Sequence, residues 1–117
     1  MTKEIDLENI GTYIKALHCQ IRWVLIDILQ DGPKSSDEIF NHLKSVSESI
    51  NDDVQCHGMC GKGDFKDLKK PSLYYHLREL ENVGIISAEF KPSESKRAPE
   101  KVWKLNMEKL TINLKKN

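Results

Sequence analysis

Residues 71–91, PSLYYHLRELENVGIISAEFK, decide the fold of this chain. Leu73, Leu77 and Leu80 recur at four- and three-residue steps, so they line one face of a helix. Gly84 is placed to end that helix, because glycine is favoured just past a helix C-terminus. The sequence therefore predicts an amphipathic helix that stops directly before an apolar pair.

A β-hairpin is predicted immediately after this helix. Residues 85–91 alternate apolar and polar side chains, and residues 101–106 alternate again after a nine-residue loop. The loop carries Lys96 and Arg97, so the tip of the hairpin is basic. A recognition helix followed by a wing has this order. The chain is therefore predicted to be mainly α with a small β-hairpin wing, a winged helix-turn-helix fold.

The same stretch resembles the ArsR-like family of winged-helix transcriptional regulators. In that family a Ser/Tyr-x-His-Leu-Arg/Lys-x-Leu run is followed by glycine and an apolar pair. The matching residues here are Tyr74, His76, Leu77, Arg78, Leu80, Gly84, Ile85 and Ile86. The resemblance extends, with one interruption, from about Leu17 to Leu105, and it implies a homodimer that binds double-stranded DNA in a sequence-specific way.

The predicted helix and wing carry the candidate DNA contacts. Hydroxyl and guanidinium groups on the helix suit base edges in the major groove, and lysine and arginine suit phosphates. The candidates are Lys69, Lys70, Ser72, Tyr74, Tyr75, His76, Arg78, Lys96 and Arg97. His76 has two open roles, a bond to a phosphate or an internal anchor of the helix.

The composition bounds the class of protein. At 117 residues the chain is one domain, and it is small for an enzyme with a deep cleft. No nucleophile–base arrangement and no phosphate-binding glycine loop is recognisable, so no enzymatic activity is predicted. No apolar run would span a bilayer and no signal-peptide pattern opens the chain, so we expect a cytoplasmic protein without a membrane partner.

The charge is sorted along the chain. The net charge is zero, but residues 1–53 hold five basic and ten acidic side chains, and residues 54–117 hold thirteen basic and eight acidic ones. The positive half contains the predicted recognition helix and wing, as an electrostatic footprint on DNA requires.

Two helices are predicted before the recognition helix. Residues 21–29 are apolar nearly all round, so this helix should be buried deeply. Asp31-Gly32-Pro33 follow it, and Ser35 with Glu38 forms a capping-box signature for the first helix of the helix-turn-helix.

Further helices are predicted at the two ends of the chain, residues 1–17 and 107–117. Their apolar positions at helical spacing are Ile5, Ile10, Ile14 and Leu17, and Met107, Leu110 and Leu114. One small winged domain does not need these stripes for its core, so we expect them to be dimerisation helices, with packing inside one chain as the alternative.

An insert, residues 44–67, separates the two halves of the helix-turn-helix. It is rich in Ser, Asp and Gly, which predicts a loop. Cys56, His57 and Cys60 at its centre offer thiolates and an imidazole, the ligands of zinc or another soft metal ion. Three readings stay open: a metal site, a reversible thiol–disulfide pair, and two cysteines without a role. Cys19 is expected to be a small core residue.

These observations predict a DNA-binding transcriptional regulator that is a candidate for metal or redox response through Cys56 and Cys60. The alternative is a winged-helix protein-interaction module that does not bind DNA. A reducing cytosol and an odd count of three cysteines argue against a structural disulfide framework.

Overall fold

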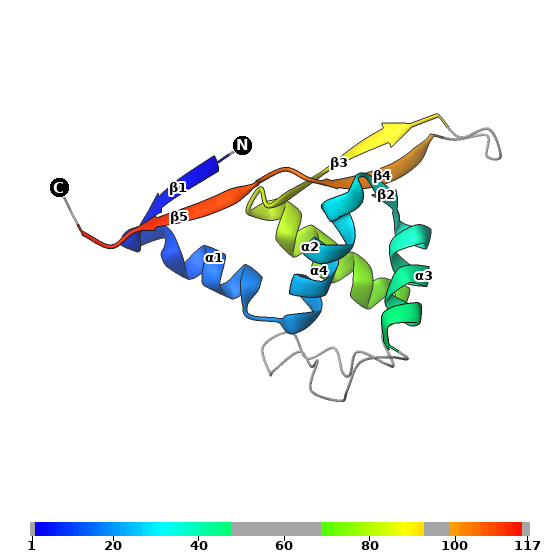
Figure 1. The fold of residues 1–117 in the computed structure, drawn as a ribbon, viewed down its shortest axis with the longest axis horizontal. Coiled ribbons are helices and arrows are strands. Elements are labelled where there is room, and N and C mark those ends of the chain that lie inside the picture. The colour runs from blue at the N-terminus through cyan, green and yellow to red at the C-terminus, as the bar shows by residue number, and fades with distance from the viewer. Residues whose placement is uncertain (1, 48–68, 93–98, 116–117) are drawn as a thin grey trace.

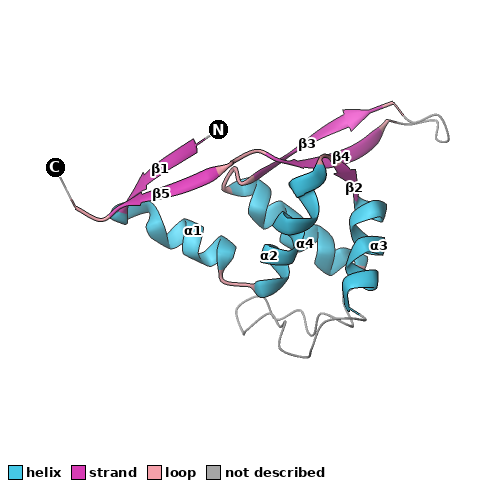
Figure 2. Cartoon of the chain, viewed as in Figure 1, coloured by secondary structure: helices cyan, strands magenta, loops and turns pink. Residues whose placement is uncertain are grey.

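The computed structural model describes residues 2–47, 69–92 and 99–115, which form a winged-helix fold with an added terminal pair of strands (Figure 1). The elements are β1 Thr2–Asp6, η1 Leu7–Asn9, α1 Ile10–Leu17, α2 Gln20–Ile28, η2 Leu29–Asp31, β2 Lys34–Ser35, α3 Ser36–Ser47, α4 Lys70–Asn82, β3 Ile86–Lys91, β4 Glu100–Leu105 and β5 Lys109–Asn113. The helices α2, α3 and α4 lie under one side of a sheet, and α1 lies beside them under β1 and β5 (Figure 2). None of the helices in these residues is long and apolar enough to cross a membrane.

The sheet of the winged domain is antiparallel, in the order β2-β4-β3. Ile86 pairs with Leu105 and Ala88 pairs with Trp103, so the two predicted apolar faces coincide. Trp103 is fully buried, and its Nε1 donates a hydrogen bond to Ser36 Oγ at 3.1 Å. The predicted fold class, mainly α with a β-hairpin wing, is confirmed.

The helix α4 has the predicted buried face and the predicted end. Leu73, Leu77 and Leu80 are fully buried. Gly84 follows with φ of 81°, a left-handed conformation that glycine adopts without steric cost. Its N–H bonds the carbonyl of Glu81 at 2.9 Å, and the next N–H bonds the carbonyl of Leu80 at 3.1 Å. These two bonds form a Schellman motif, which ends the helix by satisfying its last carbonyls.

The predicted capping box opens α3. The N–H of Glu38 donates to Ser35 Oγ at 3.2 Å, and the Glu38 carboxylate accepts from the N–H of Ser35 at 3.1 Å. The helix then runs to Ser47, so the first residues of the predicted insert continue it. The rest of the insert, residues 48–67, lies outside the described residues.

The helix α2 departs from the prediction of deep burial on all sides. Ile21, Leu25 and Ile28 are buried as expected, but Trp23 is 52% exposed. The buried face also includes a charged side chain, Arg22, which is only 2% exposed. Burial of arginine in preference to tryptophan needs specific partners, because an unpaired buried charge is costly.

The predicted C-terminal helix, residues 107–117, is wrong. Lys109–Asn113 form the strand β5, which pairs in parallel with β1 and brings Ile5 opposite Ile112. The apolar side chains of Leu110, Ile112 and Leu114 also alternate with period two, which is the pattern that the structure follows. At the N-terminus the helix is confirmed for Ile10–Leu17 only, since Thr2–Asp6 are a strand.

Two glycines should respond to alanine with opposite signs. Gly84→Ala forces a side chain into a left-handed conformation and should lower the free energy of unfolding by about 1–2 kcal/mol. Space is not the obstacle, because the nearest atom to an added Cβ is Met107 Cε at 3.7 Å. Gly11→Ala is the control, since Gly11 lies in α1 with nothing within 4 Å of an added Cβ. It should raise the same free energy by about 0.5–1 kcal/mol. Urea denaturation measures both, and equal effects would contradict the helix end described above.

Candidate nucleic-acid interface

The solvent face of α4 presents a row of polar and basic side chains. Lys70, Tyr74, Arg78 and Asn82 are exposed and lie at successive four-residue steps, so they follow one another along the helix. All four are exposed, whereas Leu73, Leu77 and Leu80 of the same helix are buried in the core. A row of ammonium, phenol, guanidinium and amide groups can meet both phosphates and base edges.

The predicted contacts on α4 separate by exposure. Lys69, Lys70, Tyr74 and Arg78 are exposed, and Ser72 and Tyr75 are half-buried. The centre of the exposed face therefore lies on Tyr74 and Arg78. Lys96 and Arg97, the predicted wing contacts, lie outside the described residues.

His76 does not belong to the exposed face. The imidazole is fully buried, and its Nδ1 accepts a hydrogen bond from Arg22 Nε at 3.0 Å. Of the two roles predicted for His76, the structure places it as an internal anchor, and contact with a phosphate is wrong. An Nδ1 that accepts from a guanidinium carries no proton, so the neutral ring holds its proton on Nε2.

Arg22 joins three helices through this bond. Its terminal nitrogen Nη1 donates to the carbonyls of Lys15 at 3.2 Å and Ala16 at 3.0 Å, which lie at the end of α1. The guanidinium also lies 5.6 Å from the centre of the Tyr75 ring, within cation–π range. Sequence reasoning missed Arg22, although a charged residue near the start of an apolar helical run was a signal for it.

The first turn of α4 is tied to α3 by an ion pair. Lys70 Nζ lies 2.8 Å from Asp37 Oδ1, with both side chains about half exposed to solvent. The hydrogen bond and the negative charge of Asp37 raise the pKa of Lys70 above its ordinary value, so the amine stays charged at neutral pH. A DNA phosphate at this position would compete with Asp37 for the ammonium group.

The described part of the wing carries further lysines. Lys91 and Lys104 lie 3.7 and 3.9 Å from oxygens of Glu89, and Lys101 Nζ lies 4.4 Å from the centre of the Trp103 ring. Phe90 on the same hairpin is 70% exposed, because β3 extends past the helices that cover its first residues (Figure 1). The wing thus offers both cations and one aromatic ring to a partner.

Of the three cysteines, one lies among the residues that the structure describes. Cys19 is fully buried, as predicted, but it is disulfide-bonded, so the expectation that the chain has no structural disulfide is wrong here. The chain's other cysteines are Cys56 and Cys60. These two and His57, the predicted metal ligands, lie outside the described residues. Within the residues that are described, no group of three or more His, Cys, Asp or Glu side chains could hold a metal ion.

Two solved structures share the fold. The chain is 18% identical to the reduced form of the transcriptional regulator YodB from B. subtilis, over 81% of this chain and 69% of that one, with a TM-score of 0.51. It is 20% identical to Pex from Synechococcus sp. (strain PCC 7942), over 88% and 83% of the two chains, with a TM-score of 0.52. No protein-family model matches the chain, and no curated protein matches its sequence. At these identities the likeness establishes the winged-helix fold.

Removal of the Arg22 side chain should destabilise the protein strongly. Arg22→Leu removes the donor to Nδ1 of His76 and to the carbonyl of Ala16, at a cost of about 2–4 kcal/mol in the free energy of unfolding. The matched control is Arg78→Leu on the exposed face, which should change the same quantity by less than about 0.5 kcal/mol.

A double-mutant cycle isolates the bond itself. The Arg22→Leu, His76→Leu double variant should lose less free energy of unfolding than the two single variants added together. In the double variant both partners of the hydrogen bond are gone, so neither side chain remains buried without the other. Urea denaturation measures all four proteins. Additive losses would show that Arg22 and His76 stabilise the protein independently.

Proposed function

We propose that this protein is a DNA-binding transcriptional regulator that reads double-stranded DNA with α4 and holds it with the β3–β4 hairpin. The observation that carries the proposal is the exposed row Lys70, Tyr74, Arg78 and Asn82 on the helix that precedes the wing. In winged helix-turn-helix proteins this helix enters the major groove, and the preceding helix crosses the backbone. The sorted charge of the chain supports the same proposal, because its positive half contains both elements.

The ArsR-like assignment is proposed on the motif around His76 and on the wing. In the ArsR-like family a C-terminal helix packs with an N-terminal helix across the two-fold axis, but Lys109–Asn113 form the strand β5 in this protein. The structural role of His76, which packs inside the domain, fits a motif kept for folding. The proposal therefore rests on the winged-helix class and not on membership of the ArsR-like family.

The homodimer is proposed to form through the terminal elements. Leu7, Ile14 and Leu114 are 41%, 56% and 69% exposed, and all three lie on η1, α1 or just past β5. Exposed apolar side chains that gather on neighbouring elements are typical of a protein interface. A two-fold dimer would present two copies of α4 to successive turns of the DNA groove.

A winged-helix module that binds only protein is the alternative. The exposed aromatic rings of Trp23 and Phe90 favour it, since aromatic side chains are enriched in protein interfaces. The basic row on α4 favours DNA. Absence of binding to mixed-sequence duplex DNA at low salt would select the protein-interaction module.

The cysteines are proposed to make DNA binding respond to metal or to oxidation. A disulfide at Cys19 supports the redox form, because Cys19 precedes α2 and its carbonyl accepts the N–H of Arg22 at 3.0 Å. In that form two thiols lose two electrons and two protons to an oxidant such as hydrogen peroxide, which becomes water. In the metal form, Cys56, His57 and Cys60 supply thiolate and imidazole ligands to zinc or another soft ion.

DNA binding should depend steeply on salt. If about four phosphates per subunit are neutralised, the slope of log K against log salt is near −7 for a dimer and about half that for a monomer. Fluorescence anisotropy at several salt concentrations, with sedimentation to give the stoichiometry, measures the slope. Binding that is insensitive to salt would exclude this surface.

Two single variants locate the contact in the same assay. Arg78→Ala removes a guanidinium that can bond guanine and should weaken specific binding by about 1–3 kcal/mol. Asp37→Asn releases Lys70 and removes a negative charge beside it, so it should strengthen binding about two- to fivefold. Weaker DNA binding by Arg78→Ala together with stronger binding by Asp37→Asn would show that DNA contacts this surface. Unchanged affinity in both variants would contradict the proposal.

The cysteine proposal is tested by DNA affinity in four conditions: zinc, chelator, reductant and oxidant. The parent, a Cys19→Ser variant and a Cys56→Ser, Cys60→Ser variant are compared, and elemental analysis of the reduced parent reports bound metal. A redox switch predicts that oxidant changes the affinity of the parent and leaves both variants unchanged. A metal switch predicts a zinc effect that only the double variant loses. Equal affinity in all four conditions excludes both.

A further inference from the structure

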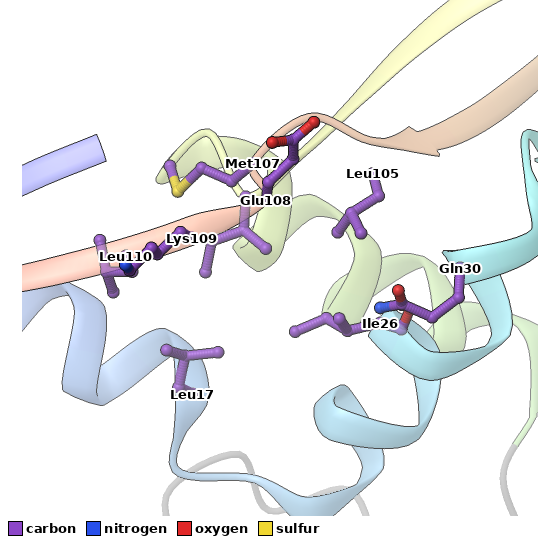
Figure 3. Close-up of a pocket in the computed structure, with 9 residues that line it drawn as sticks. Leu17, Ile26, Gln30, Leu105, Met107, Glu108, Lys109 and Leu110 are labelled. Atoms are coloured by element: carbon purple, nitrogen blue, oxygen red, sulfur yellow. The ribbon is translucent and has the colours of Figure 1, made fainter. Parts of the chain in front are cut away.

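A cavity of about 300 Å³ lies where the terminal elements meet the winged domain (Figure 3). Its walls come from the end of α1, from α2 and η2, from the residue before β3, and from the chain between the end of β4 and the start of β5. The apolar lining is Leu17, Ile26, Ile85, Leu105, Met107 and Leu110. The polar lining is limited to Gln30, Glu108 and Lys109.

The size and lining define the class of molecule that fits. A water-sized group occupies about 30 Å³, so the cavity holds roughly ten non-hydrogen atoms. Glu108 and Lys109 are exposed, and the Glu108 carboxylate points away from the apolar lining in Figure 3. The charged groups therefore lie at the rim in water, and the interior suits an uncharged, apolar molecule.

The third polar residue of the lining, Gln30, is also exposed and lies at the mouth of the cavity. The side-chain nitrogen of Gln30 donates to the carbonyl of Ile26 at 3.4 Å. Its amide oxygen can then accept a hydrogen bond from a ligand hydroxyl or N–H. Pockets that bind small molecules combine apolar walls with a few such orienting groups.

The cavity wall is joined directly to the end of α4. The carbonyl of Ile85 accepts the N–H of Asn106 at 2.9 Å and the N–H of Met107 at 3.3 Å. The side chain of Asn106 donates to the carbonyl of Gly84 at 3.1 Å. A molecule that displaces Met107 or Leu105 therefore moves the residues that end α4.

We propose that this cavity binds a small, uncharged, mainly apolar molecule with one hydroxyl or N–H donor, and that its occupancy shifts α4. Met107 suits a site of this kind, because its flexible thioether side chain adapts to a ligand at little cost. The exposed apolar side chains of the terminal elements, Leu7, Ile14, Ile112 and Leu114, do not line the cavity. A second copy docked on those side chains would therefore leave the cavity to a small molecule.

The test uses 2-naphthol, an eleven-atom probe of about the right size with one hydroxyl donor. It is titrated into the full chain without DNA, and amide chemical shifts are followed by NMR. We expect saturable shifts at the lining residues, at Asn106 and along the second half of α4. Because no DNA is present, the outcome does not depend on the proposed DNA-binding function.

Three variants fix the location of the probe. Ile26→Trp fills the cavity and should weaken binding at least about tenfold, whereas Thr12→Trp adds the same ring on an exposed position of α1 outside the lining and should not. Gln30→Met keeps the side-chain length but removes the acceptor. It should weaken 2-naphthol about fivefold and leave naphthalene unchanged, as expected for one hydrogen bond.

Three results would overturn the proposal. The first is an absence of saturable binding up to the solubility limit of the probe. The second is unchanged affinity in Ile26→Trp that is folded by circular dichroism. The third is a dimer in sedimentation that Leu110→Glu dissociates and that protects the lining from the probe, which would make the cavity part of the subunit interface.

If DNA binding is established, the site also predicts coupling. A probe that shifts α4 must change DNA affinity, and DNA must change the affinity for the probe by the same factor. DNA affinity that is identical at zero and saturating 2-naphthol would remove the coupling and leave the binding site itself in place.

Discussion

The guanidinium of Arg22 is the interaction on which the position of α4 depends. It is almost fully buried and donates to His76 on α4 and to two carbonyls at the end of α1. Those carbonyls carry the negative end of the α1 dipole, so they are good partners for a buried cation. Burial of the guanidinium costs hydration free energy, and the hydrogen bonds to His76 and to the α1 carbonyls offset that cost. Three helices are therefore held in one relative orientation by a single side chain.

The opposite end of α4 is fixed by backbone groups. Gly84 turns the chain, and the carbonyl of Ile85 accepts hydrogen bonds from the N–H groups of Asn106 and Met107, which follow β4. This junction joins α4 to the wing and to β5 in the space of a few residues. Its hydrogen bonds connect the hairpin and the terminal strands directly to the end of α4.

One face of α4 packs entirely into the core, and the other face is exposed to solvent. Leucines 73, 77 and 80 and His76 are buried, whereas Lys70, Tyr74, Arg78 and Asn82 are exposed to solvent. Asp37 holds the ammonium group of Lys70 across to α3. This pair orients the first turn of the helix, but an exposed ion pair is weak enough for a phosphate to displace it.

Local patterns in the sequence were sufficient for the central domain. The leucine spacing gave α4, Ser35 with Glu38 gave the start of α3, Gly84 gave the helix end, and the alternation after it gave the hairpin. Each of these signals acts between residues that are close in the chain, where backbone geometry and capping bonds decide the outcome.

Contacts between distant residues decided the rest. The apolar residues after Met107 fit a helix and a strand equally well by spacing, and only the pairing of β5 with β1, a hundred residues earlier, selected the strand. His76 lies on the flank of its helix, so burial was settled by Arg22, fifty-four positions away in sequence. The sequence by itself determined which helices and turns form, and the tertiary structure determined which polar side chains face inward, because a buried charge is stable only where its partners meet.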